Sequence, residues 1–350
     1  MKKLSAEAHA YLNDPSLIAE RDTWLRRMSD LFDGRSNDYN DKKVFTLHGV
    51  VPRPKNGSDL YTDPEDWVIE CLETMYAERD AKKLDGFTPI CISYPAYGVH
   101  YVDKILGAEV KFHAGQWNTE YLKNPVGALE MPDLDKNELW QCTKRAVETF
   151  LEADVKLPLQ ATPVLASPLN ILINLYGQEG FIAMYEDEDA VRHDLDIINE
   201  LIRKMHRWYI ETVPKAQLQA CAPWSRCQPQ GYGQLCGCTM QLLGGDLYRE
   251  FIADLDDAIL GEYENGGMIH LCGTHTQHME TFRNMKNLRA LQLNDQACEH
   301  LEQYLNGIRD DQVLYVTPCR GMPLDKIMDI SKGERIILAA NVAAPDKPVK

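Results

Sequence analysis

The sequence predicts an α/β fold, with a (β/α)8 TIM barrel as the favoured arrangement. Short apolar runs of strand type alternate with long amphipathic stretches along all 350 residues, and no Pro/Ser/Gly-rich linker divides the chain. Eight or nine predicted strands fit one barrel. A doubly wound open sheet is the alternative, but no GxGxxG motif follows the first predicted strand, and no GxxxxGKS/T motif occurs. We expect a single barrel domain, in which residues 1–85 form an N-terminal helical segment and the first strand, and residues 86–350 form the remainder.

The individual elements follow from the period of the apolar residues. Strands are predicted at 44–48, 89–94, 157–162, 217–221, 234–238, 267–272, 289–293, 313–317 and 336–341. Helices are predicted between most of them, at 65–84, 136–153, 179–210, 246–264, 275–286 and 322–331. The clearest helical pattern is 187–210, whose apolar residues recur every three or four positions and whose start is crowded with acidic residues, as the helix dipole favours.

Composition restricts the class of protein. Lys and Arg total 37 against 53 Asp and Glu, a net charge of −16, which gives no electrostatic reason to bind nucleic acid or an anionic membrane surface. No apolar run approaches the ~20 residues of a spanning helix, and the start of the chain has no apolar signal segment. The 10 cysteines therefore indicate reduced thiols in a cytoplasmic protein, where they are available as metal ligands or nucleophiles.

The densest group of candidate site residues ends the strand at 267–272. His270 and Cys272 are two apart, so their side chains share one face of that strand. Imidazole and thiolate are ligands that suit Zn²⁺, and Cys319, which follows the strand at 313–317, is the candidate third ligand. A His/Cys/Cys set leaves one zinc position open, as in catalytic sites. The alternative is a buried Cys and a hydrogen-bonded His at the end of a core strand, with Cys319 as a loop thiol.

Other residues near these strand ends are weaker candidates. His275 and His278 follow on the next predicted helix and could support the ligands. A second cysteine group comprises Cys221, Cys227, Cys236 and Cys238. Its spacing fits neither a zinc ribbon nor a ferredoxin, although Cys236 and Cys238 would share a strand face. Buried small thiols are the favoured interpretation of this group, with metal binding as the alternative.

Several segments together resemble the uroporphyrinogen decarboxylase superfamily. They are 161–186, with a strand, a Pro-containing turn and a helix; 246–273, which ends in IHLCG; GVHYVDKILGAEV at 98–110; and the terminal MPLDKIMDI and RIILAANVAAP. The resemblance covers most of the chain from about residue 90 to 345 and implies one (β/α)8 domain. Members of this superfamily include metal-free decarboxylases and cobamide-dependent methyltransferases.

The site residues are more similar to the methyltransferase branch, of the methylcobamide:coenzyme M type. His270 and Cys272 match the first half of its zinc motif, H-x-C…C. Asn341 and Val342 occupy the place of the last Cys of that motif, so that Cys319 would be a substitute. The signatures of the decarboxylases are missing: an Arg-rich N-terminal block, an Asp after the second strand and a C-terminal His. Arg53 is the only Arg near the first of these places.

The resemblance therefore implies a zinc-dependent methyltransferase that moves a methyl group between a corrinoid protein and a thiol or similar small acceptor. No corrinoid-binding domain is visible in the sequence, so the corrinoid would come on a separate partner protein. A homodimer is plausible for this superfamily. Two alternatives remain: a metal-free decarboxylase or lyase acting on a polycarboxylated small molecule, and a tetrapyrrole or corrinoid binder without catalysis.

Overall fold

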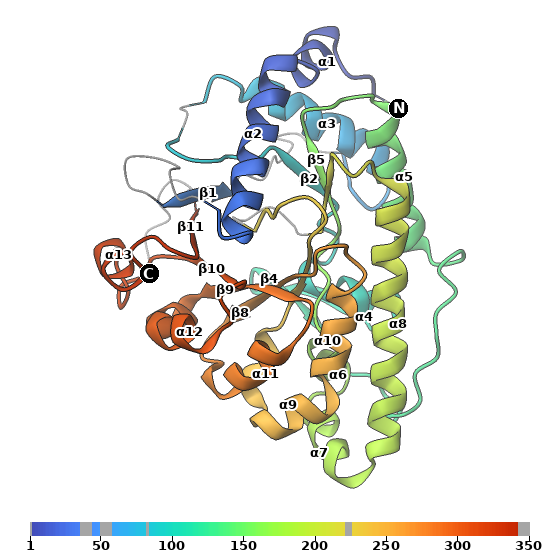
Figure 1. Cartoon of the computed structure of the whole chain (residues 1–350). Coiled ribbons are helices and arrows are strands. Elements are labelled where there is room, and N and C mark those ends of the chain that lie inside the picture. The colour runs from blue at the N-terminus through green and yellow to red at the C-terminus, as the bar shows by residue number, and fades with distance from the viewer. Residues whose placement is uncertain (1, 36–43, 50–57, 82–83, 221–225, 342–350) are drawn as a thin grey trace.

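The computed structural model describes residues 2–35, 44–49, 58–81, 84–220 and 226–341, and these form a mixed α/β fold (Figure 1). Six strands lie in the order β1-β11-β10-β9-β8-β7, and every neighbouring pair is parallel. The strands are β1 (Phe45–Gly49), β7 (Gly233–Cys236), β8 (Gly267–Cys272), β9 (Leu288–Asn294), β10 (Val313–Val316) and β11 (Ile336–Asn341). All six carboxyl ends therefore lie at the same edge of the sheet.

A second, shorter sheet has the order β2-β5-β6 and is also parallel. It contains β2 (Cys91–Ser93), β5 (Leu159–Ala161) and β6 (Leu218–Gln219). Two isolated parallel bridges join the larger sheet to segments that flank this one: Leu47 pairs with Phe87, before β2, and Cys236 pairs with Ala166, after β5. An antiparallel hairpin of β3 (Val110–His113) and β4 (Gln116–Thr119) forms a third, two-stranded sheet.

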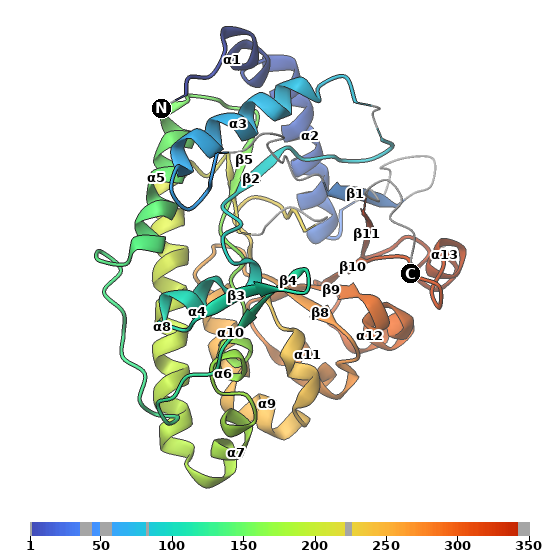
Figure 2. The same ribbon diagram turned by 180° about the vertical axis from the view of Figure 1, so that it is seen from behind.

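Helices cover the outside of the strands in both views (Figures 1 and 2). The longest, α8 (Glu188–Thr212), runs along one side of the molecule, whereas α11, α12 and α13 lie on the side of β8 to β11. Before α8 the chain forms α1 (Ala6–Leu12), α2 (Pro15–Phe32), α3 (Pro64–Ala77), α4 (Tyr101–Ile105), α5 (Glu138–Glu152), α6 (Pro168–Tyr176) and α7 (Gln178–Glu186). After it come α9 (Gly245–Phe251), α10 (Ala253–Leu260), α11 (Met279–Asn284), α12 (Leu301–Gly307) and α13 (Leu324–Ser331).

Local sequence explains where the main helices begin and which face they bury. Asp14 caps α2 by accepting hydrogen bonds from the amides of Ser16 and Leu17, and Pro15 occupies the first helical position. Asp187 caps α8 in the same way through the amide of Ala190. The apolar positions of α8 from Val191 to Met205 are buried against the interior, as the sequence pattern predicts.

Each of the nine predicted strands overlaps an observed one. Each predicted helix also overlaps an observed helix, but several are longer than the observed ones and two combine a pair of helices. The predicted helix at 179–210 is two helices, because Asp187 leaves the helical conformation between α7 and α8 and caps α8. The predicted helix at 246–264 likewise divides at Ile252 into α9 and α10. Among the described residues, no helix combines the length and apolar character needed to cross a membrane.

Candidate metal centre

The carboxyl ends of β7 and β8 bring cysteine and histidine side chains together. The two strands pair with Cys236 directly opposite His270. The chain leaves β7 at Gly237, and Cys238 begins the short 3-10 helix η2 (Cys238–Leu242), so that the Sγ atoms of Cys236 and Cys238 are 3.5 Å apart. Ligand atoms of Cys236, Cys238 and His270 all lie within 4.8 Å of one another. This group of donors could hold a metal ion.

The neighbouring strand orients the imidazole of His270. Gln292 on β9 pairs directly opposite His270, and its Oε1 lies 2.7 Å from His270 Nδ1. Because an amide oxygen only accepts hydrogen bonds, Nδ1 donates and therefore carries the proton. Nε2 then keeps its lone pair and is the atom available to a metal. His270 and Gln292 are each only 3% exposed, so packing holds both side chains in this arrangement.

A third thiol and a guanidinium complete the cluster. Cys272 Sγ lies 3.1 Å from His270 Nε2 and also contacts the thiol of Cys238. Asn294 Nδ2 donates to Cys272 Sγ at 3.6 Å. Arg226 Nη2 lies 3.2 Å from His270 Nε2, which places a positive charge beside the sulfur atoms. We call Cys236, Cys238, His270 and Cys272 together the thiol cluster.

The pKa values of the three thiols move in opposite directions. A hydrogen bond from Cys238 lowers the pKa of Cys272 against the effect of burial, and a hydrogen bond from Asn294 lowers it further. The same donor lowers the pKa of Cys236, against the effect of burial. Hydrogen bonding with Cys236 and Cys272 raises the pKa of Cys238 well above its usual value. A thiol has one proton to donate, so the cluster favours a thiolate at Cys236 or at Cys272, and thiolate is the form of cysteine that binds metals.

Two glycines allow the loops after β7 and β8 to close around the cluster. A Cβ on Gly237 would lie 2.2 Å from Met240 Cε and 2.8 Å from Ile269 Cγ2. Gly273, which directly follows Cys272, has φ of +80°, and a Cβ there would lie 2.1 Å from Gln241 Oε1. At Gly273 the positive φ is the reason for glycine, because the nearest atom is the end of a flexible side chain, whereas a Cβ on Gly237 would require Met240 and Ile269 to shift.

The side chains of His275 and His278 form hydrogen bonds with the backbone of these loops. Both side chains are fully buried, and their pKa values are lowered chiefly by that burial. His275 Nδ1 lies 3.0 Å from the carbonyl oxygen of Gly273, and His278 Nε2 lies 2.8 Å from that of Met240. Each ring therefore ties a side chain after β8 to the backbone of a loop that borders the cluster, a supporting role in keeping with the sequence interpretation.

Cys319 contacts other residues than those of the thiol cluster. After β10 its amide and carbonyl pair with those of Met322, and its thiol contacts the thiol of Cys298. Cys319 is not a member of the group whose ligand atoms lie within 4.8 Å. Its role as third ligand stays a prediction, whereas His270 and Cys272 do lie side by side.

The residues that the structure adds beside His270 are Cys236 and Cys238, for which the sequence interpretation favoured buried small thiols over metal binding. Their Cys-x-Cys spacing ends the strand next to the one that ends in His-x-Cys, and parallel pairing brings such strand ends together. Of the other members of that cysteine group, Cys227 is buried, with its thiol 3.7 Å from the carbonyl oxygen of Gln228. Cys221 lies outside the described residues.

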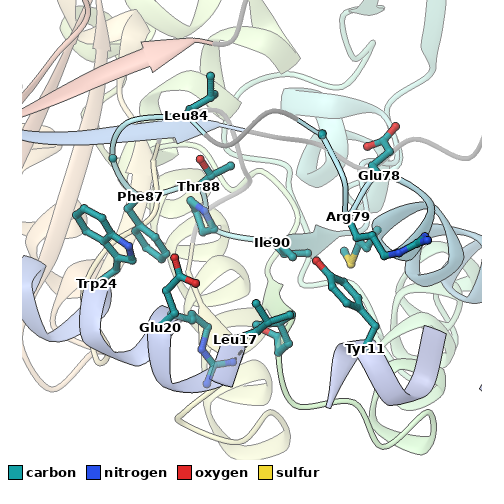
Figure 3. Close-up of a pocket in the computed structure, with 16 residues that line it drawn as sticks. Tyr11, Leu17, Glu20, Trp24, Glu78, Arg79, Leu84, Phe87, Thr88 and Ile90 are labelled. Atoms are coloured by element: carbon teal, nitrogen blue, oxygen red, sulfur yellow. Dashed lines mark hydrogen bonds between the residues drawn. The ribbon is translucent and has the colours of Figure 1, made fainter. Parts of the chain in front are cut away.

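A cavity of about 560 Å³ lies at the other ends of the strands (Figure 3). Its wall includes residues 86–90, which precede β2, and Leu157, which precedes β5. Trp24 and Phe87 lie nearly parallel there, with ring centroids 6.0 Å apart. The guanidinium of Arg21 is occupied by the carbonyls of Lys156 and Leu157. This cavity is therefore separate from the thiol cluster.

The fold and the cluster together define an α/β protein of mostly parallel strands with a Cys2His donor group at the strand ends. A solved structure of a methyltransferase from Methanosarcina mazei is similar over 92% of this chain and 94% of that chain, with a TM-score of 0.60 and 14% sequence identity. No protein-family model and no curated protein sequence matches the chain. The chain therefore has a methyltransferase-like fold, and at this identity the similarity speaks to the fold alone.

Proposed function

We propose that this protein is a zinc-dependent methyltransferase that moves a methyl group between a separate corrinoid protein and a thiol or similar small acceptor. The observation that carries the proposal is the convergence of Cys236, Cys238 and His270 within 4.8 Å. Imidazole and thiolate suit Zn²⁺, and three protein ligands leave a position open for a substrate. A metal-free decarboxylase has no use for such a donor set.

The donor set fits zinc in charge and orientation as well as in position. The lowered pKa values of Cys236 and Cys272 favour the thiolate form that zinc requires. Gln292 fixes the tautomer that turns Nε2 of His270 toward the sulfur atoms. Cys236, Cys238 and His270 would hold the ion, with Cys272 beside them. Zinc bound there would supply a Lewis acid that lowers the pKa of an acceptor thiol.

Two further side chains, those of Arg226 and Asn294, would support the donor group. Arg226, 3.2 Å from His270 Nε2, contributes positive charge that favours thiolate over thiol in the cluster. Asn294 donates to Cys272 Sγ and fixes that side chain at the edge of the cluster. His270 and Cys236 are almost fully buried, so charges beside them act in a medium of lower dielectric constant than water.

The proposal includes a closed (β/α)8 barrel of the uroporphyrinogen decarboxylase type. The segments 45–49, 87–93, 159–166, 233–236, 267–272, 288–294, 313–316 and 336–341 would be its eight strands, with β6 as an extra short strand beside β5. The two parallel bridges between the sheets support this closure, because they join β1 to the segment before β2, and β7 to the segment after β5. The thiol cluster would then lie at the carboxyl-end mouth, where barrel enzymes carry their chemistry.

Metal analysis tests the proposal directly. We expect one zinc per chain, with two or three sulfur ligands at about 2.3 Å and one nitrogen at about 2.0–2.1 Å by X-ray absorption. Methylcobalamin and a simple thiol serve as surrogate substrates, and loss of the methylcobalamin spectrum reports transfer. Absence of stoichiometric zinc from protein purified without chelator would contradict the metal assignment. Demethylation that proceeds unchanged after zinc removal would contradict the mechanism.

A further inference from the structure

The thiol cluster brings the sulfur atoms of three cysteines into contact. Cys236 Sγ is 3.5 Å from Cys238 Sγ, and Cys238 also contacts the thiol of Cys272. Two thiols in contact across a single glycine are a dithiol as well as a pair of ligands. We infer that Cys236 and Cys238 are a redox modification site, at which a hydroperoxide converts them to a disulfide that a dithiol reductant reverses.

The chemistry balances with the hydroperoxide as the named oxidant. One thiolate attacks the peroxide oxygen, which breaks the O–O bond, gives a sulfenic acid at that cysteine and leaves hydroxide. The second sulfur then attacks the sulfenic sulfur, which forms the S–S bond and expels the hydroxyl group as water. Overall, two thiols and one hydrogen peroxide give one disulfide and two waters. The two sulfurs each lose one electron, and the peroxide is reduced by two.

The local backbone can accommodate this bond. A disulfide has an S–S length of about 2.03–2.05 Å, so the two Sγ atoms must approach by about 1.5 Å from their present 3.5 Å. Cys236 is the last residue of β7 and Cys238 the first of η2, so the ladder with β8 does not have to extend through Cys238. Gly237 between them has φ of −114° and ψ of 26°, a bend that turns both side chains to one side.

Exposure sets the side from which the oxidant arrives. Cys236 is only 5% exposed, whereas Cys238 is partly exposed, so a small peroxide reaches the pair from the side of Cys238. Whichever sulfur forms the sulfenic acid, the other lies 3.5 Å away and closes the disulfide. Cys298 and Cys319 also touch, and they too combine a buried thiol with a partly exposed one, but burial raises the pKa of Cys298 and keeps its sulfur protonated.

The inference rests on the proposed function only where zinc is concerned. A disulfide removes the negative charge from both sulfurs, so the metal would keep only His270 and Cys272 as nearby donors. Oxidation would then release zinc and stop methyl transfer until the disulfide is reduced. Formation of the disulfide itself needs no metal and no methyl donor, so it is measured independently of either.

The experiment treats the full-length protein, with and without zinc, with hydrogen peroxide. We expect the zinc-free protein to lose two titratable thiols and the mass of two hydrogens, with the link mapped by fragmentation to Cys236 and Cys238. The loss should be at least about tenfold slower in Cys238→Ser and unchanged in Cys298→Ser. The zinc-loaded protein should release its zinc to a chromogenic chelator, and dithiothreitol should restore both thiols and binding.

Other outcomes overturn the inference. A disulfide between Cys238 and Cys272, or accumulation of sulfinic acid without a disulfide, would show that the assigned pair is wrong. If zinc binds and methyl transfer proceeds but peroxide removes no thiols, only the redox inference fails. If the disulfide forms in a protein that never binds zinc, the redox inference stands and the proposed function fails.

Discussion

Two groups of cysteines lie near the carboxyl ends of the parallel strands, and their surroundings differ. Cys236, Cys238 and Cys272 surround His270, with Arg226 beside it. Cys298 and Cys319 contact each other, and burial raises the pKa of Cys298 to about 12. Among the described residues, this second pair belongs to no group of three donors close enough for a metal.

The difference shows what makes a thiol reactive here. Both groups contain thiols in contact, but Cys238 contacts two other thiols, and its hydrogen bond is the main cause that lowers the pKa of Cys236 and of Cys272 against the effect of burial. The guanidinium of Arg226 lowers the pKa of Cys236 further. In the pair Cys298–Cys319, desolvation is unopposed, so the buried thiol stays protonated and inert.

The largest expected effect is on the metal itself. His270→Ala removes the imidazole from the donor group, and we expect zinc affinity to fall by at least about a thousandfold, or about 4 kcal/mol. Competition with a chromophoric chelator measures it, and methyl transfer should be lost with the metal. The far-ultraviolet circular dichroism should not change, because a core of this size does not depend on one ion. Cys298→Ala, the matched variant in the other group, should keep its zinc.

The second largest effect is on the pH dependence of the free energy of unfolding. It comes from a buried carboxyl group outside the thiol cluster. Asp256 is fully buried and accepts a hydrogen bond from Tyr248, and burial raises its pKa from the ordinary range of a carboxyl group to about 7. The native state therefore holds a proton that the unfolded chain releases. The stability that this protonation contributes is complete below about pH 4 and is lost as the pH rises through 7.

Asp256→Asn should remove this pH dependence. Between pH 5 and pH 8 the wild type should lose about 2–3 kcal/mol of unfolding free energy that the variant retains, measured by urea denaturation. Zinc binding by the variant should keep its own pH dependence, since that belongs to the thiols. If the variant and the wild type lose stability in parallel over this range, the shifted pKa does not belong to Asp256.

The strand pattern of this sequence was predictable because both faces of a parallel strand are buried. Apolar runs such as GMIHLC at 267–272 therefore stand out, and each predicted strand is present. Helix ends were less predictable, because Asp187 and Ile252 interrupt amphipathic patterns that continue on either side of them. The hairpin β3–β4 was missed: its residues 111–116 are polar or exposed and leave no apolar alternation to detect.

The candidate site was predictable only within one strand. The period of two along β8 was enough to place His270 and Cys272 on one face. The choice among Cys236, Cys238 and Cys319 depends on which strands are neighbours, and β7 rather than β10 lies next to β8. Cys236 and Cys238 were also expected to share a strand face, whereas the structure brings them together by ending the strand at Cys236.

A smaller effect tests the support that Gln292 gives to His270. Gln292→Leu removes the acceptor of the Nδ1 proton but leaves the four cluster side chains in place. We expect zinc affinity to fall by about 10- to 100-fold, the usual cost of losing such a partner. Gln312→Leu is the control: Gln312 is equally buried, and its amide bonds the carbonyls of Phe282 and Leu288. Gln312→Leu should lower the free energy of unfolding without changing zinc affinity. Equal losses of zinc affinity in both variants would mean that the effect comes from a less stable fold and not from the hydrogen bond to His270.

The smallest expected effect is that of Cys319→Ala, which tests the sequence prediction against the geometry. If the donor group is Cys236, Cys238 and His270, the variant should bind one zinc with affinity within about twofold of wild type and keep its methyl-transfer rate. The reason is that the Cys319 thiol contacts Cys298 and lies outside the group of ligand atoms within 4.8 Å. Cys236→Ser under the same conditions should lose most of its zinc. The opposite result, loss of zinc in Cys319→Ala and retention in Cys236→Ser, would mean that the loop after β10 moves to the cluster when the metal binds, and that Cys319 is a ligand.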